Sequence, residues 1–264
     1  MEDAERWIAQ SPMSDPGRHA DAIAALPVGI GPLNGIIQGV LLHADWVREY
    51  GLDATQFDAS ARRTLPVAER LEDVLRRDPQ PLQAWRPAER RSAGTCRDFA
   101  LLLCGFLRCK GVPARVRCGF AAYFAGEWED HWVCEYWDAK AGTWRLSDAQ
   151  IDGVLRQRNR IAFDAADVPR RFFLSAGEAW QACRRAEAAP SAFGHGDVAG
   201  LWFVKVNVLR DHYVLNGRET SPWDCWREAP ELKRLVPDQA LALLDDLAAR
   251  PEQPLIEIPP DWLA

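Results

Sequence analysis

The sequence has no hydrophobic run long enough to cross a membrane. Its longest apolar stretch, residues 99–107, ends at Arg108 and is far shorter than the roughly 20 residues that a bilayer requires. The opening segment, residues 1–15, is acidic and has no basic stretch followed by an apolar one, which is the pattern of a secretory signal. We therefore expect no membrane association and a cytoplasmic location.

Cysteine spacing and charge exclude further classes of protein. None of the seven cysteines forms a C-x-x-C pair, and no acidic loop has the pattern of a calcium site, so we predict no metal ion and no organic cofactor. An odd cysteine count without a regular framework indicates reduced thiols. The net charge is −6 and the arginines are scattered among acids, so the chain has no basic stripe that would bind nucleic acid.

The order of the apolar patterns predicts an α+β fold. Helical patterns come first, with a Pro/Gly break inside the first of them, at residues 20–50, 65–77 and 96–110. Extended patterns follow, the last two joined by a short turn at 139–142, at residues 114–124, 131–138 and 143–150. Helices followed by an antiparallel meander are typical of α+β proteins, here with a buried helix packed on the sheet.

Beyond residue 152 the pattern is mixed and largely helical. Residues 176–187 and 239–250 predict helices, whereas residues 201–209 fit either a strand or a buried helix. We found no internal repeat and no low-complexity linker, so we expect a single domain over residues 1–264. Its parts would be an N-terminal helical segment, a core and a C-terminal elaboration, at residues 1–60, about 60–155 and 156–264.

Cys96 stands directly in front of the most apolar helix and is the candidate nucleophile. A helix N-terminus stabilises negative charge, so this position favours a thiolate, and the small residues 93–95 before it leave room for a substrate. A cysteine nucleophile also needs a base, and a third group that holds the base. The alternative for Cys96 alone is a core thiol.

His131 is the histidine that opens a predicted strand, and it is the candidate base. If residues 139–142 form the turn, Val133 faces Asp148, and His131 is the diagonal neighbour of Asp148 on the same face. Diagonal pairs in a sheet stand about 7–8 Å apart, so an imidazole and a carboxylate can lean together. Asp152 is an alternative to Asp148 and would require a longer second strand. Arg115 is expected to pair with a nearby acid.

Three segments together resemble the core of the transglutaminase-like superfamily of papain-fold enzymes. They are GTCRDFALLLCGFLRCKGVPARVRCGF, DHWVCEYWD and GTWRLSDAQ, at residues 94–120, 130–138 and 142–150. The shared features are a cysteine before a buried helix, a Leu-Arg pair, a G-[IV]-P-A-R turn, an H-x-W pattern opening a strand, from which this sequence departs at Val133, and an aspartate that closes the next strand behind a tryptophan. These fall on Cys96, Leu107-Arg108, residues 111–115, His131, Trp144 and Asp148.

The resemblance implies attack of the Cys96 thiol on an amide or ester carbonyl, through an acyl-enzyme that water or an amine then resolves. His131 would carry protons, and Asp148 would orient its ring. The Cys96 backbone N–H would bind the oxyanion, with Trp85, Thr95 and Trp132 as further oxyanion or substrate contacts. The substrate would be a peptide, a protein or a small-molecule amide.

Two alternatives remain. The fold could serve as a non-catalytic binding module, although binding alone does not need all three residue types. An arylamine acetyltransferase shares the Cys-His-Asp arrangement, but the glycine-rich surroundings of its cysteine are not found here. Residues 193–226 lie outside the resemblance and are rich in polar groups, namely His195, Asp197, Asn207, Arg210 and Asp211. They would either cover the cleft and set substrate choice or form a packed tail with satisfied polar groups.

Overall fold

The computed structural model describes residues 2–57, 59–124, 126–225 and 236–256. The chain forms two compact units. The first comprises Met1–Val116 and Val133–Pro169, and the second comprises Arg117–Trp132 and Arg170–Ala264. The predicted core, about 60–155, therefore contributes residues to both units.

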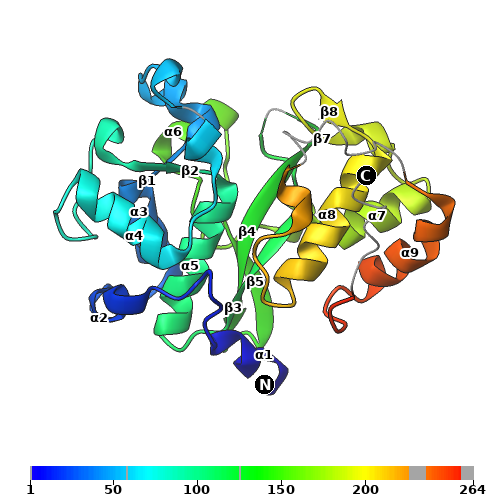
Figure 1. Cartoon of the computed structure of the whole chain (residues 1–264), viewed down its shortest axis with the longest axis horizontal. Helices are drawn as coiled ribbons and strands as arrows, with labels where there is room; N and C mark the ends of the chain where they lie inside the picture. The colour runs from blue at the N-terminus through cyan, green and yellow to red at the C-terminus, as the bar shows by residue number, and fades with distance from the viewer. Residues whose placement is uncertain (1, 58, 125, 226–235, 257–264) are drawn as a thin grey trace. The chain divides into compact units, whose positions relative to one another are not determined.

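The first unit is built around α5 (Cys96–Cys109), which is buried over most of its length. Three further helices pack against it, as Figure 1 shows: α2 (Ala20–Ala24), α3 (Ile30–Val40) and α4 (Val67–Arg77). The short helices α1 (Glu2–Glu5) and α6 (Gly153–Asn159) complete the unit. The predicted helices at 65–77 and 96–110 are thus confirmed. Apolar residues at helical spacing on α5 supply the face that its neighbours cover.

The helix predicted to continue to residue 50 ends earlier, at Val40. Residues Leu41–His43 form β1, which pairs in parallel with β2 (Ser92–Gly94). The hydrogen bonds of this pairing come from a distant segment, so they override the local helical pattern. A 3₁₀ segment follows at Ala44–Tyr50 and ends at Gly51, whose φ is +75°.

Antiparallel pairing in the first unit joins β4 (Trp128–Asp138) to β5 (Thr143–Ser147). The register runs from Asp138 opposite Thr143 to Cys134 opposite Ser147, which leaves residues 139–142 as the turn. The predicted turn and register are confirmed. The strand before them, β3 (Ala114–Ala121), is buried on both faces. The Arg115 Nε donates to Glu135 Oε2 at 2.7 Å, so the expected structural role of Arg115 is also confirmed.

The second unit holds a mixed sheet with strand order β6-β3-β4-β7-β8. The strands β6 (Phe173–Ser175) and β8 (Val198–Ala199) pair antiparallel to β3 and β7, but β7 (Phe193–His195) runs parallel to β4. A purely antiparallel sheet was therefore the wrong prediction, because the chain returns to β4 through α7 and meets it in the same direction. At Gly119 a Cβ would lie 2.1 Å from the Leu174 carbonyl oxygen, so the approach of β6 requires glycine there.

Three helices pack together in the second unit: α7 (Ala176–Arg184), α8 (Leu201–Val214) and α9 (Leu241–Ala249) (Figure 1). Residues 201–209, which fitted a strand or a buried helix, are the buried helix. Nearly all of α8 is enclosed, including its polar residues, so the helix has no separate polar face and its sequence carries no amphipathic signal. Phe120 packs edge-on against Phe193 and Phe203 at centroid distances of 5.0 and 6.3 Å.

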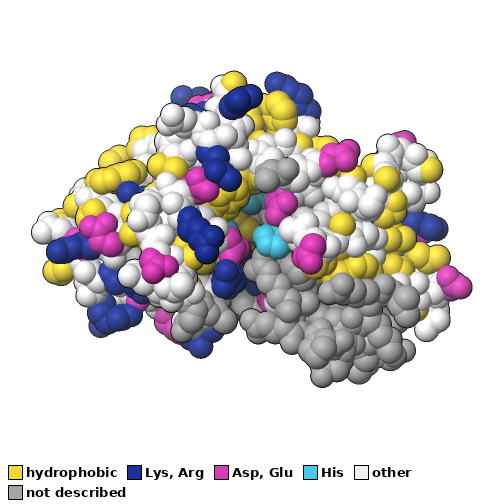
Figure 2. All heavy atoms as spheres, turned by 90° about the horizontal axis from the view of Figure 1, so that it is seen from above, with side chains coloured by type: hydrophobic (Ala, Val, Ile, Leu, Met, Phe, Trp, Pro, Cys, Tyr) yellow, Lys and Arg dark blue, Asp and Glu magenta, His cyan; other side chains and the backbone are white. Residues whose placement is uncertain are grey.

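None of the helices in the described ranges combines the length and the apolar character that crossing a bilayer requires. On the face drawn in Figure 2, Lys and Arg side chains lie among Asp and Glu side chains. Among the described residues, the large hydrophobic side chains that are exposed are few and stand apart in the sequence: Val28, Trp85 and Val154.

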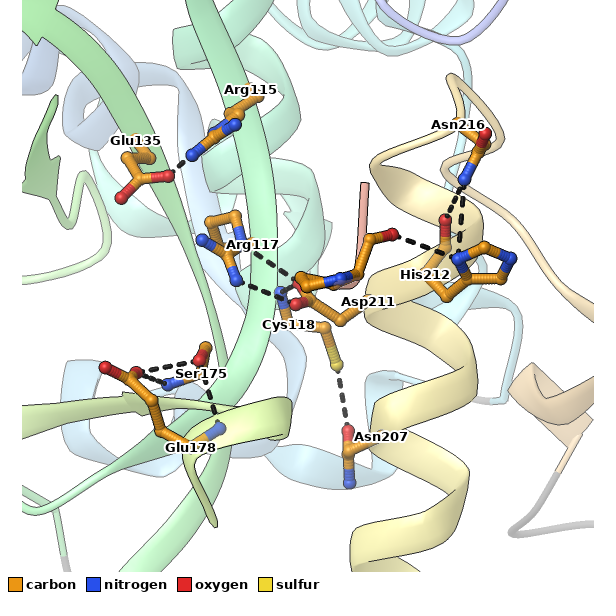
Figure 3. Close-up of polar contacts among 11 residues, drawn as sticks. Arg115, Arg117, Cys118, Glu135, Ser175, Glu178, Asn207, Asp211, His212 and Asn216 are labelled. Carbon is orange, nitrogen blue, oxygen red and sulfur yellow. Dashed lines mark hydrogen bonds and ion pairs between the residues drawn. The ribbon is translucent and has the colours of Figure 1, made fainter. Parts of the chain in front are cut away.

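His212 fastens the segment after α9 to α8 (Figure 3). Its Nδ1 donates to the Pro251 carbonyl at 3.0 Å, and its Nε2 accepts the Ile256 backbone N–H at 3.2 Å. The ring is fully buried, and this burial lowers its pKa, against the opposing effects of the Pro251 hydrogen bond and the Asp211 charge. The His212 ring is therefore neutral in the folded protein, with one nitrogen as a donor and the other as an acceptor.

We expect the second unit to lose stability as the pH falls below about 6.5. The unfolded chain takes up a proton at His212 there and the folded chain does not, which costs up to about 1.4 kcal/mol per pH unit. Urea titrations between about pH 7.5 and 5.5, followed by hydrogen exchange of α8 peptides, measure this slope. His212→Gln should flatten it. An equal slope in this variant would contradict the assignment to His212.

Candidate active site

Cys96 is the first residue of α5, so its thiol lies at the N-terminus of a helix of 14 residues. The side chain is half-buried. Cys109 and Cys183 are half-buried too, but they lie at the opposite ends of their helices, and burial raises the pKa of both thiols. Among the described cysteines, Cys96 therefore has the position that best stabilises a thiolate.

A capping box of Thr95 and Asp98 starts α5. The Thr95 backbone N–H donates to Asp98 Oδ2 at 2.7 Å, and the Thr95 hydroxyl lies 3.2 Å from the same oxygen. A carboxylate so near Cys96 would by itself oppose a thiolate. Arg70 from α4 pairs with Asp98 Oδ1 at 2.8 Å, and both side chains are buried. This pair neutralises the carboxylate and leaves the helix end favourable for an anion.

Arg70 also holds the strand that leads to Cys96. Its Nη1 donates to the Ser92 hydroxyl at 2.8 Å and to the Ala93 carbonyl at 2.6 Å. Between these residues and the helix lies Gly94, where a Cβ would be 2.9 Å from the Asp98 side chain. Glycine therefore allows the strand β2 to approach the capping box, and the arginine locks it there.

Asp148 follows β5 in the first unit and is almost completely buried. Its backbone N–H donates to the Ala165 carbonyl at 2.8 Å, and its Oδ1 accepts the Gln150 N–H at 2.9 Å. The preceding Ser147 receives a hydrogen bond of 3.0 Å from Asn34 on α3. Asp148 thus has a fixed backbone and a carboxylate oriented by an Asx turn.

Asp152, the alternative carboxylate, is the N-cap of α6. Its Oδ1 accepts the N–H groups of Val154 and Leu155 at 3.0 Å, and its Oδ2 accepts the Tyr50 hydroxyl at 2.8 Å. Burial and the Asp152 charge raise the pKa of Tyr50 far above its usual value, which keeps this hydroxyl a donor. Both oxygens of Asp152 therefore serve the structure.

His131 belongs to the second unit and lies on β4, with 2% of its surface exposed. The rings of Tyr123 and Phe124 meet its imidazole edge-on, at centroid distances of 5.7 and 4.9 Å. Alternation along a strand directs His131 to one face of β4 and its neighbours Asp130 and Trp132 to the other. Aromatic walls of this kind restrict the ring to few orientations.

The remaining candidates have separate surroundings. Trp85 is 62% exposed in the first unit, and the Arg91 guanidinium covers its ring at 4.4 Å. Thr95 is the residue before α5 and belongs to the capping box. Trp132 is 2% exposed in the second unit, and the Arg210 guanidinium lies 4.7 Å from its ring. Of the two tryptophans, Trp85 is therefore the accessible one.

Arg70 and Asp98 were not predicted from the sequence as part of this site. The pattern Thr95-x-x-Asp98 before an apolar run is a capping-box signal and would have indicated the role of Asp98. Arg70 carries no such signal, because a surface arginine on an amphipathic helix looks the same in the sequence. Among the described residues, no group of three or more His, Cys, Asp or Glu side chains is arranged to hold a metal ion.

Comparison with known proteins finds a family match for part of the chain. The model of the transglutaminase-like superfamily matches residues 38–149, a stretch that includes Cys96, His131 and Asp148. No curated protein and no solved structure matches the chain. The resemblance that the motifs around Cys96 and the Gly111–Arg115 turn predict is thus confirmed by this match, which covers less than half of the chain.

Proposed function

We propose that this protein is an enzyme that transfers or hydrolyses acyl groups through a Cys96 thioester, with His131 as the proton carrier and Asp148 as its orienting carboxylate. The observation that carries the proposal is the place of Cys96, half-buried at the first turn of α5 within the matched transglutaminase-like segment. The same family match supports a papain-like core.

The roles follow from the chemistry of each group. The Cys96 thiolate attacks an amide or ester carbonyl carbon, and the bond to the leaving group breaks as His131 donates a proton to that group. Water or an amine then attacks the thioester carbon and gives its proton to His131, while the sulfur leaves as thiolate. Backbone N–H groups at the start of α5 stabilise the oxyanion. Asp148 stabilises the imidazolium.

The other described groups near these residues support this assignment. Arg70 neutralises Asp98, so the first turn of α5 keeps its preference for negative charge. Asp152 is the N-cap of α6, which favours Asp148 over Asp152 as the orienting carboxylate. Trp85, exposed and backed by Arg91, is proposed as a substrate contact, and an amide of a peptide, a protein or a small molecule as the substrate.

Alkylation by iodoacetamide tests the proposal. At about pH 6 an ordinary thiol with a pKa near 8.5 is only roughly 0.3% ionised, so it reacts slowly. We expect Cys96 to react at least about tenfold faster than Cys109 and Cys183, and this advantage to disappear in His131→Ala. Mass mapping of each cysteine peptide over time gives the rates within one sample.

Equal, slow reaction of all three thiols would contradict the proposal and favour a non-catalytic binding module. A second measurement addresses the acyl donor. Intact-mass analysis after exposure to pools of peptide amides should show a covalent adduct on Cys96, and its mass identifies the acyl group. Cys96→Ser is the matched control and should show no thioester adduct.

A further inference from the structure

Arg210 on α8 contacts the strand that carries His131, β4. Its Nη1 lies 3.4 Å from both carboxylate oxygens of Asp130, and its guanidinium lies 4.7 Å from the centre of the Trp132 ring. Asp130 and Trp132 are the two neighbours of His131 in the chain. All four residues belong to the second unit.

Because of strand geometry, Arg210 contacts the face of β4 opposite to His131. Successive side chains of a strand point to opposite faces, so Asp130 and Trp132 share one face of β4 and His131 points from the other. A single side chain that contacts both neighbours restrains the strand on either side of His131. On the face of His131 itself, Tyr123 and Phe124 pack against the imidazole.

Arg210 is itself held in place. Its Nη1 donates to Asn207 Oδ1 at 2.9 Å, and Asp224 lies 3.3 Å from its Nε. Asn207 in turn donates to the Phe203 carbonyl at 3.1 Å and accepts from the Cys118 thiol at 2.9 Å. Figure 3 shows Asn207 on α8 directed at Cys118 on β3. The side chains of Arg210 and Asp130 are 6% and 7% exposed, so the pair is shielded from solvent.

We propose that Arg210 is the positioning residue of His131: it sets the place and orientation of the imidazole through the opposite face of β4. This inference rests on the function proposed above for His131. Arginine suits the task because its planar group stacks on an aromatic ring and pairs with a carboxylate at the same time, which lysine does not match. A displacement of about 1 Å in a reacting group is enough to cost roughly a hundredfold in rate.

The rate of Cys96 alkylation at about pH 6 tests the inference, because it reports whether His131 is placed to form the ion pair. We expect Arg210→Met to slow this reaction about tenfold, to nearly the rate of His131→Ala. Arg210→Lys should give an intermediate rate, since it keeps the charge but not the planar stack. Arg184→Met is the matched control in the same unit, as it removes only an exposed pair with Asp245, and should react like the unmodified protein.

The double variant Arg210→Met/His131→Ala separates positioning from general destabilisation. If Arg210 acts through His131, the double variant reacts no more slowly than His131→Ala alone. Far-UV circular dichroism and amide protection of α8 show which variants are folded. If Arg210→Met does not fold, Asp130→Asn is the milder test, because it weakens the pair between Arg210 and Asp130. It should slow alkylation of Cys96 severalfold.

The outcomes distinguish the two proposals. Wild-type rates in folded Arg210→Met and in Asp130→Asn, with slow His131→Ala, would overturn the role of Arg210 and leave the proposed function standing. An equal loss from Arg210→Met with and without His131 would overturn that role as well. If His131→Ala reacts like the unmodified protein, both proposals fail.

Discussion

Replacing Arg70 by methionine is expected to lower the free energy of unfolding of the first unit by about 3–5 kcal/mol. The pair with Asp98 is buried, and removal of the arginine leaves an unpaired carboxylate inside the protein. The Ser92 hydroxyl and the Ala93 carbonyl also lose a donor. Urea unfolding, with hydrogen exchange of peptides from β2 and α5, measures the loss and locates it.

Two further variants test whether the loss of stability in Arg70→Met comes from the unpaired charge of Asp98. Arg70→Met/Asp98→Leu removes both ions and should recover most of the stability, apart from about 1 kcal/mol for the lost capping contact to Thr95. Arg76→Met on the same helix breaks an exposed pair with Asp73 and should cost less than about 1 kcal/mol. A loss in Arg70→Met as small as that in Arg76→Met would refute the interpretation.

Replacing Asp211 by leucine is expected to destabilise the second unit by a similar amount, about 3–5 kcal/mol. Asp211 on α8 accepts from Arg117 at 3.1 and 2.8 Å and from the Cys118 backbone N–H at 2.9 Å (Figure 3). Both side chains of the ion pair are buried. The substitution strands a guanidinium and a backbone donor in the interior at once. Hydrogen exchange of α8 and β3 peptides, together with urea unfolding, measures the effect.

Asp211→Asn separates the two causes of the lost stability, which are the unpaired Arg117 charge and the unsatisfied Cys118 backbone N–H. The amide oxygen can still accept the Cys118 N–H, so this variant should retain part of the stability while the Arg117 charge stays unbalanced. Arg184→Met provides a control with no measurable change, because its pair with Asp245 is exposed. If Asp211→Leu were as stable as this control, the buried pair would not fasten β3 to α8.

The roles of the polar residues in the C-terminal region could be predicted from the sequence only in part. Asn207, Arg210 and Asp211 were expected either to cover a cleft or to be satisfied within a packed tail. The structure supports the second interpretation for these three, since each makes hydrogen bonds within the second unit. They belong to a regular buried helix rather than an irregular tail. Their partners on β3 and β4 lie about 80 to 90 positions away, a separation that local periodicity does not reveal.

Local features were predictable because short-range chemistry determines them. The helix from Cys96 begins after a capping residue and ends near Gly111, whose φ is +72°. The four-residue turn set the register of β4 and β5, since a hairpin loop of fixed length leaves one pairing. The predicted sheet failed at β7, because the direction of a strand that returns after a helix depends on the path of the whole chain.

From its residues alone, the sequence determined the helix that begins at Cys96, the hairpin register and the resemblance to the transglutaminase-like superfamily, whose model matches residues 38–149. These depend on spacing, capping and turn length, which are properties of neighbours in the chain. The tertiary structure alone decided that Arg70 neutralises Asp98 beneath Cys96, and that Arg210 holds the two neighbours of His131. A charged side chain that is buried needs a counter-charge beside it. Tertiary packing supplies that partner from a distant part of the sequence, so the sequence alone does not identify it.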